Sequence, residues 1–147
     1  MLQEEKGIAC LIAEHQADSP EAGRILDHLQ EQVERMKTAK KESNLKVLID
    51  AEYSFYELII HEAKNPLHFD IYHTLRSFLH DVIKEAFLNR LGVTTAPLTH
   101  QALLNAIRQG DREQALRLYQ KHVQTGKDKI KSHIRSSPAK KSDITLS

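Results

Sequence analysis

The sequence is poor in the residues that cross-link, bend or anchor a chain. Its 147 residues include one Cys, no Trp, 5 Gly and 4 Pro. A single Cys cannot form an internal disulfide, which favours a reducing compartment, and we expect the cytoplasm. The longest apolar run, from Ile8 to Ala13, is far shorter than the roughly 20 residues that cross a bilayer. We therefore expect no membrane-spanning segment.

The chain also lacks an excess of charge of either sign. It has 21 Lys plus Arg against 20 Asp plus Glu, a formal net charge of +1. Such a balance gives no broad positive field for wrapping nucleic acid or for binding an anionic membrane. A length of about 150 residues suits one domain with a substantial core. The composition has one surplus to explain, which is nine His against four Tyr and four Phe.

The few Gly and Pro residues favour long helices. Together they number 9, about half of what an average usage of about 12% gives. Helix starts are indicated at Ser19-Pro20 and Asn65-Pro66, and a stop followed by a new start at Gly110-Asp111. Between these marks the apolar residues recur at helical spacing. We predict helices over residues 2–16, 20–40, 44–63, 66–90, 97–109 and 111–134.

These helices predict an all-α fold in one domain. No segment shows the sustained alternation of a strand, and the short connections favour antiparallel neighbours. The sequence therefore predicts an antiparallel bundle of six, or at most seven, helices over residues 1–135. Residues 136–147 are rich in Ser and Lys without apolar periodicity, and we predict a disordered tail.

Polar side chains interrupt three of the predicted apolar faces. Glu52 and Tyr56, four residues apart, complete the inward face of the third helix. His100 shares a face with Leu103 and Leu104, and His122 falls inward on the last helix. An ionised carboxylate inside a core is costly unless something pairs with it. One carboxylate and two imidazoles suit a divalent ion such as Zn, Ni or Fe.

Each of these residues also has an ordinary structural interpretation. A buried His is more often hydrogen-bonded to the backbone than bound to a metal, and a buried Glu is more often paired with Arg or Lys. The seven other histidines scatter over several helix faces, where exposed positions explain them. Spacing alone leaves both interpretations open.

Several runs of the sequence resemble one family of bacterial regulators. The runs are Glu52-Tyr53-Ser54-Phe55-Tyr56, then Asn65-Pro66, then His100-Gln-Ala-Leu-Leu-Asn-Ala-Ile-Arg-Gln-Gly-Asp111, then His122. The resemblance is to the effector-binding (FCD) domain of the FadR subfamily of GntR-type transcription regulators, whose pattern ends in a His twenty-two residues after the earlier one. It extends from the Ile8 to Glu14 segment to about Lys131.

The resemblance implies a helical bundle around a central ligand cavity. In such domains Asp and three His hold a divalent metal, which binds a small carboxylate effector. The two later ligands correspond to His100 and His122. Glu52 stands in place of the family's Asp and Tyr56 in place of its first His, so the metal is either retained with this altered set or lost. The position of Arg76 in the next helix is one where the family frequently has an Arg that could clamp a carboxylate.

The resemblance also implies a homodimer that controls DNA-binding domains. In the family a winged helix-turn-helix precedes the effector domain, and we expect that this chain has none and is either a fragment or a stand-alone sensor. We therefore predict a ligand-sensing and dimerisation domain rather than an enzyme.

Two alternatives remain open at this point. A centre of two His and one carboxylate also occurs in metal-dependent enzymes. A purely structural dimerisation module is the other.

Overall fold

The computed structural model describes residues 3–74 and 95–135, and within these ranges all regular structure is helical. The labelled helices are α1 (Gln3–Gln16), α2 (Pro20–Lys41), α3 (Leu45–Glu62), α5 (Ala96–Gln109) and α6 (Arg112–Arg135). A further helical segment covers residues 66–74. The all-α prediction is confirmed, and the five labelled helices begin and end within one residue of the predicted limits. The remainder of the predicted helix 66–90 and the tail 136–147 lie outside the described residues.

Side chains from the residues before several helices explain where those helices start. Ser19, Asn44, Asn65 and Asp111 each accept a hydrogen bond from the backbone N–H three residues further on, at 3.1–3.4 Å. These bonds satisfy donors that the first turn of a helix leaves unpaired. At the end of α5, Gly110 adopts the left-handed conformation with φ 73°, which terminates the helix at little steric cost. Three of these start signals and the stop are those predicted from the sequence.

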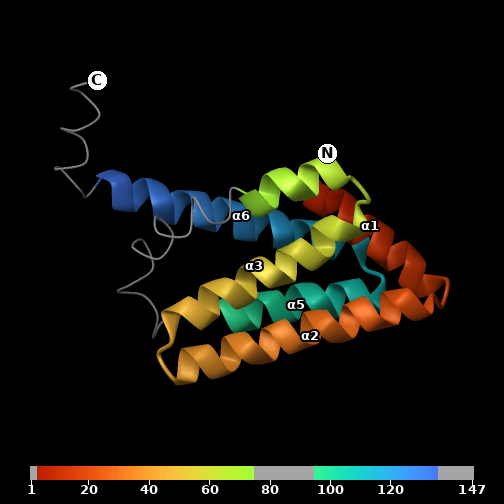
Figure 1. Ribbon diagram of the computed structural model, residues 1–147, viewed down its shortest axis with the longest axis horizontal. Helices are drawn as coiled ribbons and strands as arrows, with labels where there is room; N and C mark the ends of the chain where they lie inside the picture. Colours follow the sequence, from red (N-terminus) through yellow and green to blue (C-terminus); the bar gives the residue numbers. More distant parts are fainter. Residues whose placement is uncertain (1–2, 75–94, 136–147) are drawn as a thin grey trace.

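The helices pack as an antiparallel bundle. Figure 1 shows the long α2 lying along α3 and α5, with α1 and α6 completing the assembly. None of the described helices is long and apolar enough to cross a bilayer.

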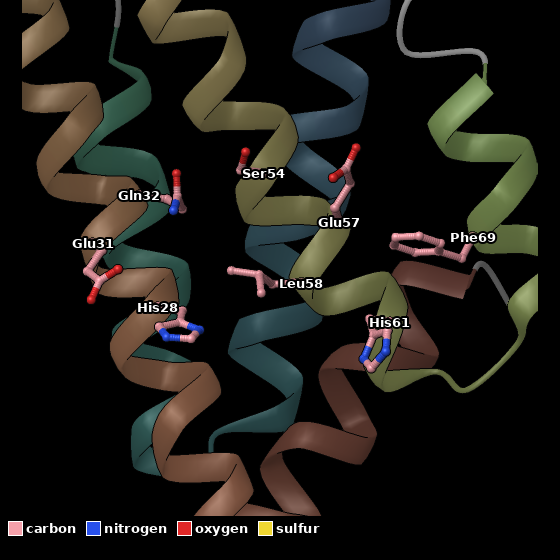
Figure 2. Close-up of a pocket in the computed structure, with 8 residues that line it drawn as sticks. All are labelled: His28, Glu31, Gln32, Ser54, Glu57, Leu58, His61 and Phe69. Carbon is pink, nitrogen blue, oxygen red and sulfur yellow. The ribbon is translucent and has the colours of Figure 1, made fainter.

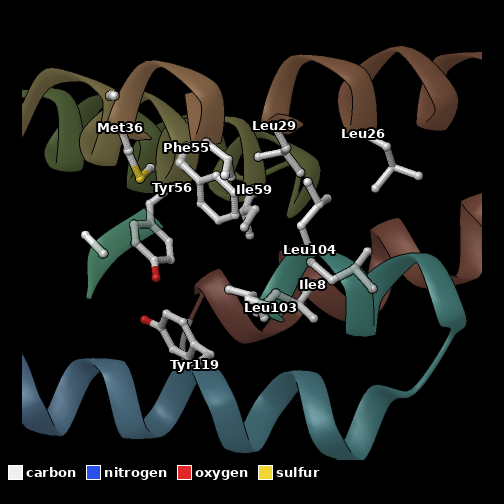
Figure 3. Packing of buried hydrophobic residues seen from close by; sticks show 14 of the residues in the cluster. Ile8, Leu26, Leu29, Met36, Phe55, Tyr56, Ile59, Leu103, Leu104 and Tyr119 are labelled. Carbon is white, nitrogen blue, oxygen red and sulfur yellow. The ribbon is translucent and has the colours of Figure 1, made fainter. Parts of the chain in front are cut away.

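The core forms where the apolar faces of these helices meet. Figure 3 shows α2, α3 and α5 contributing most of its large side chains. The largest fully buried apolar residues are Phe55, Ile8, Leu11, Leu29, Met36, Ile59, Ile60, Leu103, Leu104 and Ile107. Within each helix these residues recur on one face, four apart from Phe55 to Ile59 and seven apart from Leu29 to Met36, which is the periodicity that the sequence displays. Burial of this continuous apolar set is the main stabilising contribution to the bundle.

One glycine permits a close crossing of α1 over α3. A Cβ added at Gly7 would collide with the backbone carbonyl oxygen of Ile59. Because that contact is with backbone, it cannot be relieved by a side-chain rotation. Gly7 therefore sets how closely α1 approaches the helix that carries Glu52 and Tyr56.

Candidate functional site

His100 lies in the centre of the bundle with one ring nitrogen oriented by the backbone. Its exposed fraction is 1%, and its Nδ1 lies 2.6 Å from the carbonyl oxygen of Ala96, one turn earlier on α5. A carbonyl only accepts hydrogen bonds, so Nδ1–H donates and Nε2 keeps a lone pair. Among the described residues, the buried Nε2 has no hydrogen-bond partner. Metal-binding histidines are oriented in the same way, by a bond from the other ring nitrogen.

The electrostatics keep the His100 ring neutral. The pKa of His100 is lowered from 6.5 to about 3, chiefly by burial and also by the neighbouring His122, while the bond to Ala96 has a smaller opposing effect. Desolvation has this sign because it disfavours the charged imidazolium. The ring is therefore a lone-pair donor over the whole neutral pH range.

Tyr56 packs against both histidines, which also contact each other. Its ring centroid is 5.3 Å from that of His100, at 60°, and 5.2 Å from that of His122, at 29° in a stacked arrangement. The two imidazole centroids are 5.0 Å apart. The structure thus brings together residues from α3, α5 and α6 that the sequence places on three separate inward faces.

The Tyr56 hydroxyl is held in its neutral form. Burial raises the pKa of Tyr56 well above 10, and the negative charge of Glu52 raises it further. Figure 3 shows the hydroxyl pointing toward α6, where the hydroxyl of Tyr119 points back toward it. Burial also raises the pKa of Tyr119, with a further contribution from Glu4. A phenol in this environment is a poor source of the phenolate that would bind a metal.

Glu52 lies beside this cluster and borders two pockets. It is half-buried, one turn before Tyr56 on α3. With His122 it lines a small pocket of about 160 Å³ and a larger pocket of about 540 Å³ at the start of α5. Lys121 also lines the larger pocket, which is otherwise bordered mainly by small and apolar side chains from α5 and α6.

The described residues meet part of the requirement for a metal site. The tautomer of His100 fits a divalent ion, and the ring of His122 contacts the ring of His100. Within residues 3–74 and 95–135, however, no group of three or more His, Cys, Asp or Glu side chains is arranged to hold an ion. A third ligand would require movement of Glu52 or a residue outside the described ranges. The metal therefore stays a prediction, as does the role of Arg76, which lies outside them.

Other histidines of the surplus gather on a different face of α3. Figure 2 shows a groove between α2 and α3, with His28, Glu57, His61 and Phe69 among its lining residues, and its volume is about 360 Å³. His73 is exposed and its Nδ1 lies 3.3 Å from Glu57 Oε1. His28, His61 and His73 are exposed, which agrees with the structural interpretation of these histidines from the sequence.

Sequence reasoning left three tyrosines without a role. Tyr53 and Tyr72 line the small pocket with Glu52, and Tyr119 packs 5.9 Å from Tyr56 between ring centroids. The inward phase of Tyr119 is readable from the spacing on α6. The meeting of Tyr53 with Tyr72 depends on how segment 66–74 crosses α3, which no local pattern encodes.

A comparison with known families identifies the domain. Residues 5–125 match the family described as the FCD domain. No curated protein and no solved structure gives a match. The matched range covers α1 to α3, α5 and most of α6. It therefore includes Glu52, Tyr56, His100 and His122. The chain belongs to the FCD family, the effector-binding domains of GntR-type transcription regulators.

Proposed function

We propose that this domain senses a small organic acid through a divalent ion held by His100, His122 and Glu52. The observation that carries the proposal is the orientation of His100, whose Nδ1–H bonds to Ala96 and leaves a buried Nε2 lone pair. A bound divalent ion would supply a concentrated positive charge for a carboxylate ligand. Membership of a family of regulators favours this sensing role over catalysis.

The residues around the ion position would have distinct tasks. His100 is fixed by its backbone bond and His122 by stacking on Tyr56. Neutral imidazole and carboxylate are ligands that Zn, Ni and Fe accept. Tyr56 packs against both rings as a neutral phenol, and its hydroxyl can donate a hydrogen bond to an incoming acid. Arg76 is proposed as a second contact for the acid, since its fork matches two carboxylate oxygens.

Control of DNA binding would follow from a change in a dimer. We propose that two copies associate and that the effector favours one arrangement of the DNA-binding domains they control. Such a shift requires the acid to bind one arrangement more tightly than the other. Light scattering of the purified domain, with and without Zn, measures whether the dimer exists. A monomer at all concentrations would contradict this part of the proposal.

Calorimetric titration of metal-free protein with Zn or Ni tests the metal site. We expect one ion per chain, with affinity reduced at least about tenfold by His100→Gln and by His122→Gln. His28→Gln, which changes an exposed histidine of the outer groove, is the matched control and should bind the ion as the wild type does. Equal affinity in all four proteins would remove His100 and His122 from the site.

A further inference from the structure

Glu62 is a buried carboxyl group that lies outside the pockets of the proposed function. It belongs to the last turn of α3, three residues after Ile59, where α1 approaches closely at Gly7. Its side chain is 1% exposed, and among the described residues neither Oε1 nor Oε2 of Glu62 has a hydrogen-bond partner. An ionised carboxylate without donors is strongly unfavourable in such a place. The dipole of α3, which is negative at this end, adds to the cost.

The charged groups around Glu62 come from both helices that pack against this end of α3. Glu14 of α1 has its carboxylate within hydrogen-bonding reach of Glu62, and Glu21 lies in the first turn of α2. On α3 itself, Nδ1 of the exposed His61 ring lies 3.7 Å from Glu62 Oε1. The following turn supplies Lys64, whose Nζ lies 3.3 Å from Glu14 Oε1. The charges that α1 and α2 bring to Glu62 are therefore negative, and Lys64 pairs with Glu14 rather than with Glu62.

One proton on Glu62 satisfies both carboxyl groups. When both are ionised they only accept hydrogen bonds, so neither can serve as a partner for the other. A protonated Glu62 donates its O–H to Glu14, in a bond that the charge of the acceptor strengthens. The negative charge belongs on Glu14, because its side chain is 28% exposed and paired with Lys64. Burial raises the pKa of Glu62 above 4.5, and Glu14 raises it further through the hydrogen bond and its charge.

We infer that Glu62 keeps a proton in the folded domain and shares it with Glu14, so that an acid-dependent hydrogen bond fastens α1 to α3. Its stabilisation is fully present below about pH 4.5 and is lost as the pH rises through the pKa of Glu62 in the folded domain. Above that value two negative charges face each other, and the end of α1 opens more often. The device makes the attachment of the first helix depend on pH, independently of the ion and the effector of the proposed function.

Carbon-13 nuclear magnetic resonance of the glutamate carboxyl groups in the full chain tests where the proton lies. The Glu62 resonance is assigned by its loss in Glu62→Gln, and we expect it to titrate with a midpoint above 4.5. Glu14→Gln removes the neighbouring charge and should shift this midpoint downward. Glu31→Gln changes an exposed carboxylate of α2 and should leave it in place. A Glu62 midpoint at or below 4.5, or one that Glu14→Gln does not move, would overturn the inference.

Amide hydrogen exchange in the last turn of α1 tests whether the shared proton holds the two helices together. The side chain of Glu62→Gln keeps a donor at every pH and has nearly the same volume. Above the Glu62 midpoint, the last turn of α1 should therefore exchange about tenfold more slowly in this variant than in the wild type at the same pH. Below the midpoint the two should exchange alike, and Glu31→Gln should follow the wild type throughout. Equal exchange in wild type and Glu62→Gln above the midpoint would contradict the fastening of α1.

Discussion

The neutral state of His100 makes the stability of the metal-free domain depend on pH in a defined direction. In the unfolded chain the imidazole gains its proton near the ordinary value of 6.5, whereas in the folded domain burial lowers the pKa of His100 to about 3. Between about pH 6.5 and 3 the His100 ring binds a proton in the unfolded state but not in the folded state. His100 therefore destabilises the fold progressively as the pH falls from about 6.5 toward 3.

The magnitude follows from the two pKa values. Each pH unit between them is worth about 1.4 kcal/mol. At about pH 4.5, two units below the unfolded value and above the folded one, the loss relative to about pH 7.5 is roughly 2.7 kcal/mol. His100→Gln removes the titrating group, so the variant should lose roughly 2.7 kcal/mol less than the wild type over this interval. Any constant cost of the substitution cancels in the comparison.

Urea unfolding in EDTA at these two pH values measures the effect. The quantity of interest is the change in the free energy of unfolding with pH, wild type minus variant. His28→Gln serves as the control for a His-to-Gln change at an exposed position outside the bundle centre, and it should follow the wild type. Identical pH dependence in wild type and His100→Gln would refute the reasoning, because it would mean that the ring is protonated as readily inside the bundle as outside.

Four further substitutions test other parts of the structure. Gly7→Ala should destabilise the domain by about 1–3 kcal/mol, because the added Cβ collides with Ile59. Gly23→Ala should stabilise it by about 0.5–1 kcal/mol, because nothing lies near the added Cβ. Urea unfolding that ranks the two variants the other way would contradict the close crossing of α1 over α3. Burial raises the pKa of Glu62, whose side chain is 1% exposed, so its ionisation opposes folding as the pH rises above 4.5. Glu62→Gln should therefore gain stability relative to the wild type between about pH 4.5 and 7. A relative loss of stability in the same urea assay would disprove this expectation. Ser19→Ala should cost about 1 kcal/mol in thermal unfolding through the lost cap, and an unchanged midpoint would show that the cap contributes nothing.

Helix limits were predictable because they are encoded locally. Ser19 and Asp111 cap the helices that follow them, and Gly110 ends the one before, so each boundary depends on a few neighbouring residues. The same holds for the inward phase of His100 and Tyr56, which follows from the spacing of their apolar neighbours. The helix α5 begins at Ala96, one residue earlier than predicted, and here Thr95 makes no capping hydrogen bond with its side chain.

The contacts of the site were not predictable, because they depend on how helices cross. The sequence alone does not distinguish Gly7, which permits the close approach of α1, from Gly23, which borders open space. It also does not indicate that the Ala96 carbonyl selects the tautomer of His100, or that Tyr53 meets Tyr72. The crossing at Gly7 and the contact of Tyr53 with Tyr72 join different elements, whereas helical periodicity describes one element at a time. The bond from His100 to Ala96 lies within α5 and depends on the orientation of the His100 ring, which the spacing of apolar residues does not specify.

Direct observation of the His100 ring nitrogens tests the central claim. In nitrogen-15 nuclear magnetic resonance of the metal-free domain, we expect a protonated Nδ1 and an unprotonated Nε2 near pH 7. Addition of Zn should shift the Nε2 resonance strongly while Nδ1 keeps its proton, because the bond to Ala96 persists. A proton on Nε2, or a ring that does not respond to Zn, would contradict the account of this domain as a metal-assisted sensor.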